Sequence, residues 1–146
     1  MTATAHALIG GAVAASVGNP VVGISLSALS HPLVDMIPHW DFGLGWKEKT
    51  KLRLFLEASF DLILGVVISY LIFGHNVNTW YFLACVLASE IWDMAVAPYW
   101  FFNWRFFPFS TIYSLQHSIQ GRAKLPWGIL SQLATVSVIV VLLKAL

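Results

Sequence analysis

The segment HPLVDMIPHWD, which begins at His31, places two histidines and two aspartates within eleven residues of a largely apolar chain. His31 and Asp35 are four residues apart, so a helix presents both side chains on one face. Pro38 ends that helix, and His39 and Asp41 follow in the next loop. Because ionisable groups are costly inside a bilayer, this cluster constrains both the fold and the chemistry of the chain.

The composition predicts an integral membrane protein. Hydrophobic residues make up 58% of the chain, charged residues 10%, and the mean hydropathy is +0.76; soluble domains carry roughly 25% charged residues. The length of 146 residues suits one membrane-embedded domain, residues 1–146. A net charge of +1 without a long basic stripe argues against nucleic-acid binding, and the single Cys85 excludes a disulfide framework within the chain.

Five hydrophobic segments predict an all-α helical bundle. They cover about residues 3–17, 20–37, 54–73, 80–97 and 125–143. The first two are short for full spans, which need around 20 residues. Their small residues, Gly10 and Gly23 among them, predict a close approach between these two helices.

Three interruptions complete the predicted architecture. Pro32 frees the Ala28 carbonyl within the second segment and kinks that helix. The aromatic stretch from Tyr99 to Phe109 suits the membrane interface, where Trp and Tyr are enriched. Residues 110–124 are expected to form a polar connection to the last segment. The N-terminal segment lacks the basic residues of a signal peptide, so we expect it to remain in the mature protein.

Basic residues predict the orientation of the bundle. Lys and Arg flank the loops after the second and fourth segments and are missing from the other two loops. The positive-inside rule then places the N-terminus in the cytoplasm and predicts five crossings. Nearly all the candidate ligands fall at this same cytoplasmic end, which predicts one composite site.

The residue types in this predicted site suit a divalent metal. Imidazole and carboxylate ligands favour zinc, with manganese or iron as alternatives, and there are enough candidates for one or two ions. The remaining carboxylates, Asp41 and Glu90, are candidates for catalytic roles such as a general base. The candidate metal ligands are His6, His31, Asp35, His39, Asp61, Asp93 and His117.

Two motifs resemble those of a family of small bacterial and archaeal inner-membrane proteins described as membrane-bound, metal-dependent hydrolases (the YdjM-like group). The sequence AHALIGG carries His6, and SHPLVD carries His31 and Asp35, extended by PHWD. The family is distantly likened to zinc-dependent phospholipase C. The resemblance covers about the first 41 residues; the HRGxTHS-like and PD-D motifs of the family are missing, and QHSIQGR around His117 is a weak analogue of the former. It implies metal binding and hydrolase chemistry at a prokaryotic inner membrane.

Three functional hypotheses follow from the sequence. The first is a metal-dependent hydrolase at the cytoplasmic membrane face, with membrane lipids as neighbours and a lipid or lipid-linked phosphoester as substrate. The second is a transporter or channel component in which Asp61, Glu90 and Asp93 form an ion or proton path. The third is a structural membrane subunit whose polar cluster fixes helix packing. Clustering of the carboxylates toward one side favours the first over the second.

Overall fold

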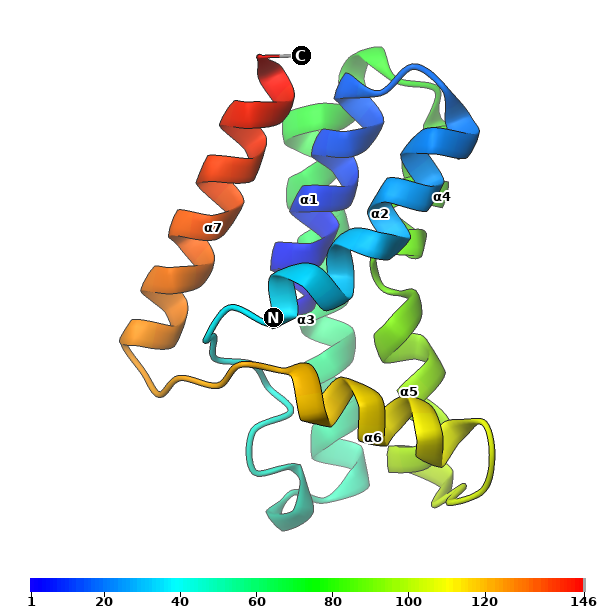
Figure 1. Ribbon diagram of the computed structural model, residues 1–146, viewed down its shortest axis with the longest axis vertical. Coiled ribbons are helices and arrows are strands. Elements are labelled where there is room, and N and C mark those ends of the chain that lie inside the picture. Colours follow the sequence, from blue (N-terminus) through cyan, green and yellow to red (C-terminus); the bar gives the residue numbers. More distant parts are fainter. Residues whose placement is uncertain (146) are drawn as a thin grey trace.

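The computed structural model describes residues 1–145 and confirms the all-α prediction (Figure 1). Two short 3₁₀ turns, Trp46–Glu48 and Gly74–Asn76, precede α3 and α4. The helices are α1 (Ala3–Ser16), α2 (Pro20–Asp35), α3 (Lys51–Phe73), α4 (Thr79–Ser89), α5 (Ile91–Phe102), α6 (Phe109–Ile119) and α7 (Trp127–Lys144).

Helix α1 is the central element, and α2, α3, α4 and α7 pack around it (Figure 1). Glycines allow the close approaches. A Cβ on Gly10 would lie 2.8 Å from the Cys85 carbonyl oxygen of α4, and one on Gly65 of α3 would lie 2.6 Å from the Cα of Thr4. Gly10 therefore faces α4 rather than the expected α2.

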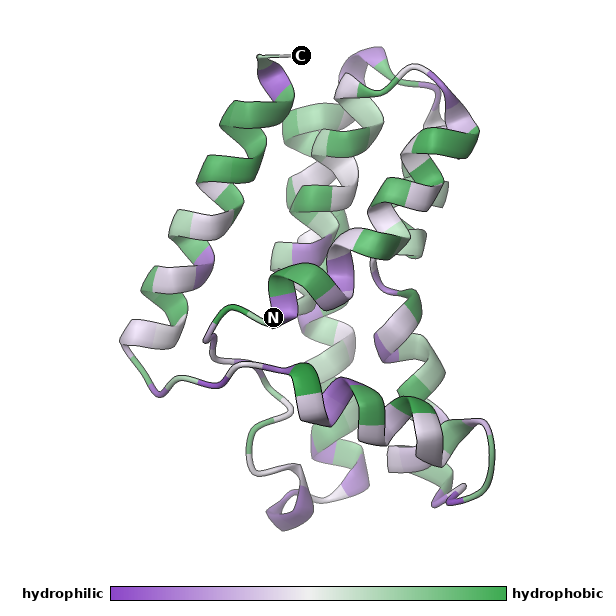
Figure 2. Ribbon diagram, in the orientation of Figure 1, coloured by the Kyte–Doolittle hydropathy of each residue, from purple (hydrophilic) through white to green (hydrophobic). Residues whose placement is uncertain are grey.

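The outer surface of the bundle is apolar, as a bilayer requires. The segment Lys51–Asn76 and helix α7 are long and apolar enough to cross a membrane, and α4 with α5 adds a third crossing if the bent pair is one span. Hydrophobic residues predominate along these helices (Figure 2), and many of their large apolar side chains are exposed. Helix α1 has 14 residues and is largely buried, and at a rise of about 1.5 Å per residue it is shorter than the hydrocarbon core. The five crossings stay a prediction.

The fourth hydrophobic segment is broken where the sequence predicts one helix over residues 80–97. Helices α4 and α5 meet at Glu90 with a bend of 53°. Helix ends leave backbone carbonyls without intrahelical partners, and the break frees the Ser89 carbonyl to accept a hydrogen bond from a side chain of α2. The aromatic stretch is also divided, because Tyr99 to Phe102 form the last turn of α5.

Helix α6 lies where the sequence predicts only a polar connection. It packs on α5, with the rings of Tyr99 and Tyr113 stacked at 4.0 Å. The chain after α6 then runs beside the loop that follows α2. The Gly121 amide donates to the Asp35 carbonyl at 2.7 Å, and the Ala123 amide donates to the His39 carbonyl at 2.8 Å. These bonds hold the end of α6 against the His- and Asp-rich segment.

The carbonyl that Pro32 frees has a partner, which confirms the prediction for Ala28. The indole Nε1 of Trp92 in α5 donates to the Ala28 oxygen at 3.1 Å. We expect Trp92→Phe to lower the free energy of unfolding by about 1 kcal/mol, because an interior carbonyl loses its donor. A thermal or denaturant melt in detergent measures this change. The matched control, Trp80→Phe, alters an exposed indole and should have little effect; equal losses in the two variants would contradict the assignment.

Candidate metal centre

Three elements bring histidines and aspartates together beneath α6. His6 comes from α1, His31 from α2 and Asp93 from α5, and one ligand atom from each lies within 4.8 Å of the other two. The imidazole rings of His6 and His31 are stacked at 3.7 Å. Asp35, one turn after His31, adjoins this group, and His39 in the following loop lies next to Asp35. This group could hold a metal ion.

Backbone carbonyls fix the orientation of two of these imidazoles. His31 Nδ1 lies 2.6 Å from the Ser89 carbonyl oxygen that the α4–α5 break frees. His39 Nδ1 lies 2.8 Å from the Ile37 carbonyl oxygen. A carbonyl accepts only, so each Nδ1 carries the proton, and in the neutral ring Nε2 keeps its lone pair. Metal-ligating histidines have this same arrangement, in which the second ring nitrogen donates to a carbonyl or carboxylate.

The Nε2 atoms of the three histidines face carboxylate oxygens at distances that suit metal ligation. Nε2 of His6 lies 3.2 Å from Asp35 Oδ1, and Nε2 of His31 lies 3.4 Å from Asp35 Oδ2. Nε2 of His39 lies 3.3 Å from Asp41 Oδ2. Charge-assisted hydrogen bonds are shorter, at roughly 2.7–2.9 Å. Two ligands of a tetrahedral zinc ion, each about 2.0–2.1 Å from the metal, are separated by about 3.3 Å.

His6 supplies two of the buried polar atoms that lack a hydrogen-bond partner. Its side chain is fully buried, and neither Nδ1 nor Nε2 has a hydrogen-bond partner among residues 1–145. Leaving a buried polar atom unsatisfied costs about 1–3 kcal/mol. Asp35, its nearest carboxylate, also contacts the amino group of Met1. A cation coordinated by His6 would satisfy the imidazole and balance the carboxylates around it.

Two glutamines of the α6 region are site residues that the sequence analysis did not identify. Gln116 donates through Nε2 to Asp93 Oδ1 at 2.6 Å, and Gln120 donates through Nε2 to Asp41 Oδ2 at 2.9 Å. Each amide nitrogen also lies near the Nε2 of the neighbouring imidazole, at 3.5 and 3.2 Å respectively. The four-residue spacing of the two amides is the available signal in the sequence, but the polar character of residues 110–124 predicts a connection there.

We expect Gln116→Met to lower metal affinity by about 10- to 100-fold, the usual effect of removing a partner that orients a ligand. The thioether keeps side-chain volume but cannot donate to Asp93. Competition against a fluorescent zinc chelator measures the change. Ser118→Ala, an exposed position on the same helix, is the control; an affinity unchanged in both variants would contradict this orienting role.

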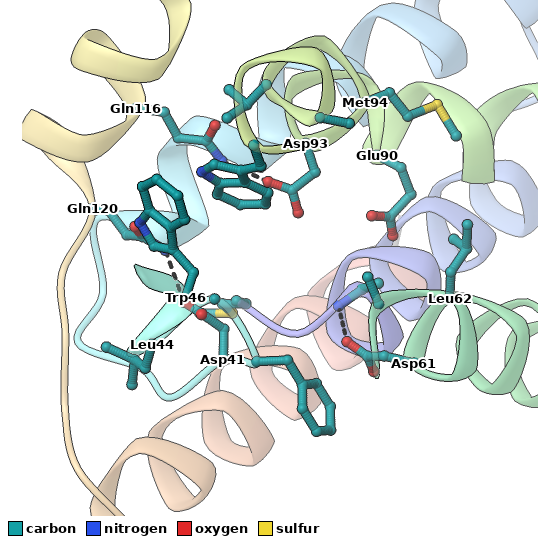
Figure 3. A pocket seen from close by; sticks show the side chains of 18 of the residues that line it. Asp41, Leu44, Trp46, Asp61, Leu62, Glu90, Asp93, Met94, Gln116 and Gln120 are labelled. Carbon is teal, nitrogen blue, oxygen red and sulfur yellow. Dashed lines mark hydrogen bonds between the residues drawn. The ribbon is translucent and has the colours of Figure 1, made fainter. Parts of the chain in front are cut away.

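A cavity of about 240 Å³ opens beside the cluster. Four carboxylates form its polar side and point into the hollow (Figure 3). Asp41 comes from the loop after α2, Asp61 from α3, Glu90 from the N-cap position of α5, and Asp93 from the first turn of α5. Asp93 is 33% exposed and forms the open edge of the histidine group. Glu90 is buried, and its Oε1 has no hydrogen-bond partner among residues 1–145. The cavity therefore brings a free carboxylate next to the candidate metal ligands.

The side chain of Asp61, which belongs to α3, lies against the N-terminus of α1. Its carboxylate accepts hydrogen bonds from the amides of Ala3 at 2.6 Å and Thr4 at 3.2 Å, and from the Thr4 hydroxyl at 2.7 Å. A carboxylate at this point satisfies amides that have no intrahelical partner and interacts favourably with the helix dipole. These contacts give Asp61 an anchoring role, and it lies outside the His6–His31–Asp93 group.

His117 lies on the exposed side of α6, apart from the other histidines. Arg122 donates to its Nδ1 at 2.6 Å, and its ring lies 5.5 Å from that of Tyr113. Partial burial and the nearby Arg122 and Lys47 cations lower the pKa of His117. His117 borders the cavity beside the cluster, but the structure does not bring it into the group of converging ligands.

Comparison of the chain with protein-family models, curated proteins and solved structures found no match. The resemblance to the YdjM-like group therefore stays a prediction from two short motifs. The functional assignment below depends on the geometry of this site.

Proposed function

We propose that this protein is a membrane-embedded, metal-dependent hydrolase that cleaves a phosphoester. One observation carries the proposal. The Nε2 atoms of His31 and His39, whose Nδ1 protons are directed to backbone carbonyls, converge on aspartate oxygens at the spacing of ligands around a zinc-class ion. The lone pairs of neutral imidazoles and carboxylates repel one another, and a divalent cation bound between them would remove that repulsion.

The geometry supports two neighbouring ion positions. His6, His31 and Asp93 would hold the first ion, and Asp93 leaves that position open toward the cavity. His39 and the adjacent Asp41 carboxylate would hold the second. Asp35 contacts imidazoles of both groups: its Oδ2 faces His31, and its Oδ1 faces both His6 and His39. Asp35 would therefore contribute to both positions, and Asp41 is better assigned as a ligand than as the base.

Divalent ions bound there would polarise a phosphoryl oxygen and lower the pKa of water to about 7. The water oxygen attacks phosphorus as the ester P–O bond breaks, and the departing alcohol oxygen takes up a proton. Glu90 is the carboxylate placed to accept the proton of the attacking water, because its Oε1 is unpartnered and it borders the cavity. Gln116 and Gln120 orient the aspartates during this step.

The surroundings of the site support a location at the cytoplasmic face of a prokaryotic inner membrane. The cavity lies between α3, which is long and apolar enough to cross a membrane, and α5, which would complete a span together with α4. Lys47 and Arg122 border a second hollow that shares Trp46, Tyr113 and His117 with the cavity. The positive-inside rule, by which basic loops favour the cytoplasm, supports this side for the site and the N-terminus.

Hydrolysis of bis(p-nitrophenyl) phosphate by purified protein in detergent tests this function. We expect release of p-nitrophenol that stops after chelator treatment and returns when zinc or manganese is added. His75→Ala, which removes an exposed histidine outside the site, should behave as the wild type. Hydrolysis that survives metal removal would contradict the proposal, as would a metal-loaded protein without activity that carries ions across vesicles.

A further inference from the structure

The walls of the cavity are apolar above its carboxylate floor. Phe55, Ala58 and Leu62 lie on one stripe of α3, spaced as i, i+3 and i+7. Met94 and Ala97 face them from α5, spaced as i and i+3. The small side chains of Ala58 and Ala97 leave the space between the two helices open. An apolar wall of this kind suits a hydrocarbon chain.

The mouth of the cavity opens sideways between α3 and α5. Phe55 is 55% exposed and Met94 is 44% exposed, although both line the cavity. At the end of the cavity away from Glu90 the two helices are joined: the rings of Phe55 and Phe101 lie 6.1 Å apart, and Lys51 Nζ donates to the Phe101 carbonyl at 2.7 Å. Since α3 is a candidate membrane span, a bilayer around α3 would place lipid next to this opening.

The polar end of the same space carries uncompensated positive charge. Among residues 1–145, neither Arg122 nor Lys47 has a carboxylate oxygen within 4.0 Å. Arg122 is directed instead to Nδ1 of His117 and Oε1 of Gln120. A guanidinium with open donors recognises phosphate well. Arg122 lines the cavity itself, and Lys47 lines the adjoining hollow, which Arg122 also borders.

From these features we propose that the substrate is a single-chain amphiphilic phosphoester. Its hydrocarbon chain enters from the bilayer between α3 and α5, its phosphorus lies at the aspartates on the cavity floor, and an anionic oxygen contacts Arg122. The inference rests on the proposed function, because it names the substrate class of that same site. It requires that chain and anion each contribute to binding, through residues that do not hold the metal.

Native mass spectrometry of the detergent-solubilised protein tests the binding mode without catalysis. The probes are dodecylphosphonate, methylphosphonate as an anion without a chain, and dodecanol as a chain without an anion. Each buried methylene contributes roughly fourfold in affinity, so we expect dodecylphosphonate to be retained at least tenfold better than either partial probe. Equal retention of the two phosphonates would overturn the proposal and leave a free anion as the ligand.

Variants of the cavity wall and of Arg122, each with a control, assign the two contributions. Ala97→Trp, or Ala58→Trp if that protein is unstable, fills the cavity and should lower dodecylphosphonate retention about tenfold without changing methylphosphonate retention. Ile63→Trp, exposed on α3 and outside the cavity lining, is its control. Arg122→Gln should weaken both phosphonates and spare dodecanol, and Arg105→Gln is the charge-matched control.

The outcomes separate this inference from the proposed hydrolase. The protein could retain dodecylphosphonate in a chain-dependent way, lose this retention in Ala97→Trp, and yet neither bind metal nor hydrolyse bis(p-nitrophenyl) phosphate. That result would overturn the proposed hydrolase function only. Metal-dependent hydrolysis with retention that ignores chain length and is equal in Ala97→Trp and Ile63→Trp would overturn the amphiphile only.

Discussion

His31→Gln is expected to lose bound metal and phosphoester hydrolysis together. The imidazole is fully buried, and its Nε2 faces both Asp35 and Asp93, so its replacement removes the ligand shared by most of the cluster. Removing only an orienting partner costs about 10- to 100-fold in metal affinity, so the loss of a ligand should exceed 100-fold. Asp93→Asn, which preserves shape and removes charge, should show the same loss. Chelator competition and p-nitrophenol release measure the two effects.

The stability of these variants distinguishes the loss of a metal ligand from the loss of helix packing. His75→Ala serves as the histidine control because its side chain is exposed and outside the site. If the polar cluster only fixes helix packing, His31→Gln and Asp93→Asn would lower the melting temperature while the wild type binds no metal. Retention of wild-type metal affinity in both variants would also contradict the ligand assignment.

Asp61→Asn is expected to destabilise the fold while leaving the metal in place. The carboxylate accepts three hydrogen bonds at the start of α1, and bonds to a charged group contribute about 1.5–3 kcal/mol each. An amide presents one acceptor oxygen and an extra donor in a space built for two acceptors. We therefore expect the free energy of unfolding to fall by about 3 kcal/mol. Denaturant titration in mixed micelles measures the loss, and elemental analysis measures the metal.

Glu57→Gln provides the carboxylate control on the same helix. Glu57 pairs with Lys49 and Arg53 near the surface, where ion pairs contribute about 0–1 kcal/mol. A destabilisation no larger than this control would contradict the anchoring role of Asp61. Loss of the metal at unchanged stability would restore Asp61 to the ligand set that the sequence predicts.

The local part of the site could be predicted because spacing alone determines it. The four-residue spacing of His31 and Asp35 puts them on one helix face wherever the helix lies. Pro38 ends the helix, so His39 and Asp41 follow only a few residues after Asp35. His6 and Asp93 could be proposed from residue type and membrane side, and the structure brings both to His31. His117 shares their side of the molecule, but the exposed face of α6 separates it from the other imidazoles. Residues that are predicted on the same side of the membrane therefore need not contact one another.

The break at Glu90 and the helical nature of α6 could not be predicted from hydropathy. Apolar residues continue on both sides of residue 90, and only Ser89, Glu90 and Asp93 interrupt them. The break depends on tertiary contacts, among them the hydrogen bond that His31 Nδ1 donates to the Ser89 carbonyl. Helix α6 buries Gln116 at the site and exposes most of its other polar side chains to the outside. The mean hydropathy of the segment does not reveal this one-sided pattern.

The most direct test of the metal centre is zinc-edge X-ray absorption, with elemental analysis, on protein purified without chelators and reloaded with zinc. We predict one to two ions per chain, with a first shell of nitrogen and oxygen at about 2.0–2.1 Å and no sulfur, because the one thiol, Cys85, is not among the converging ligands. A protein that stays free of metal after reloading would contradict the account, as would a shell with sulfur at about 2.3 Å.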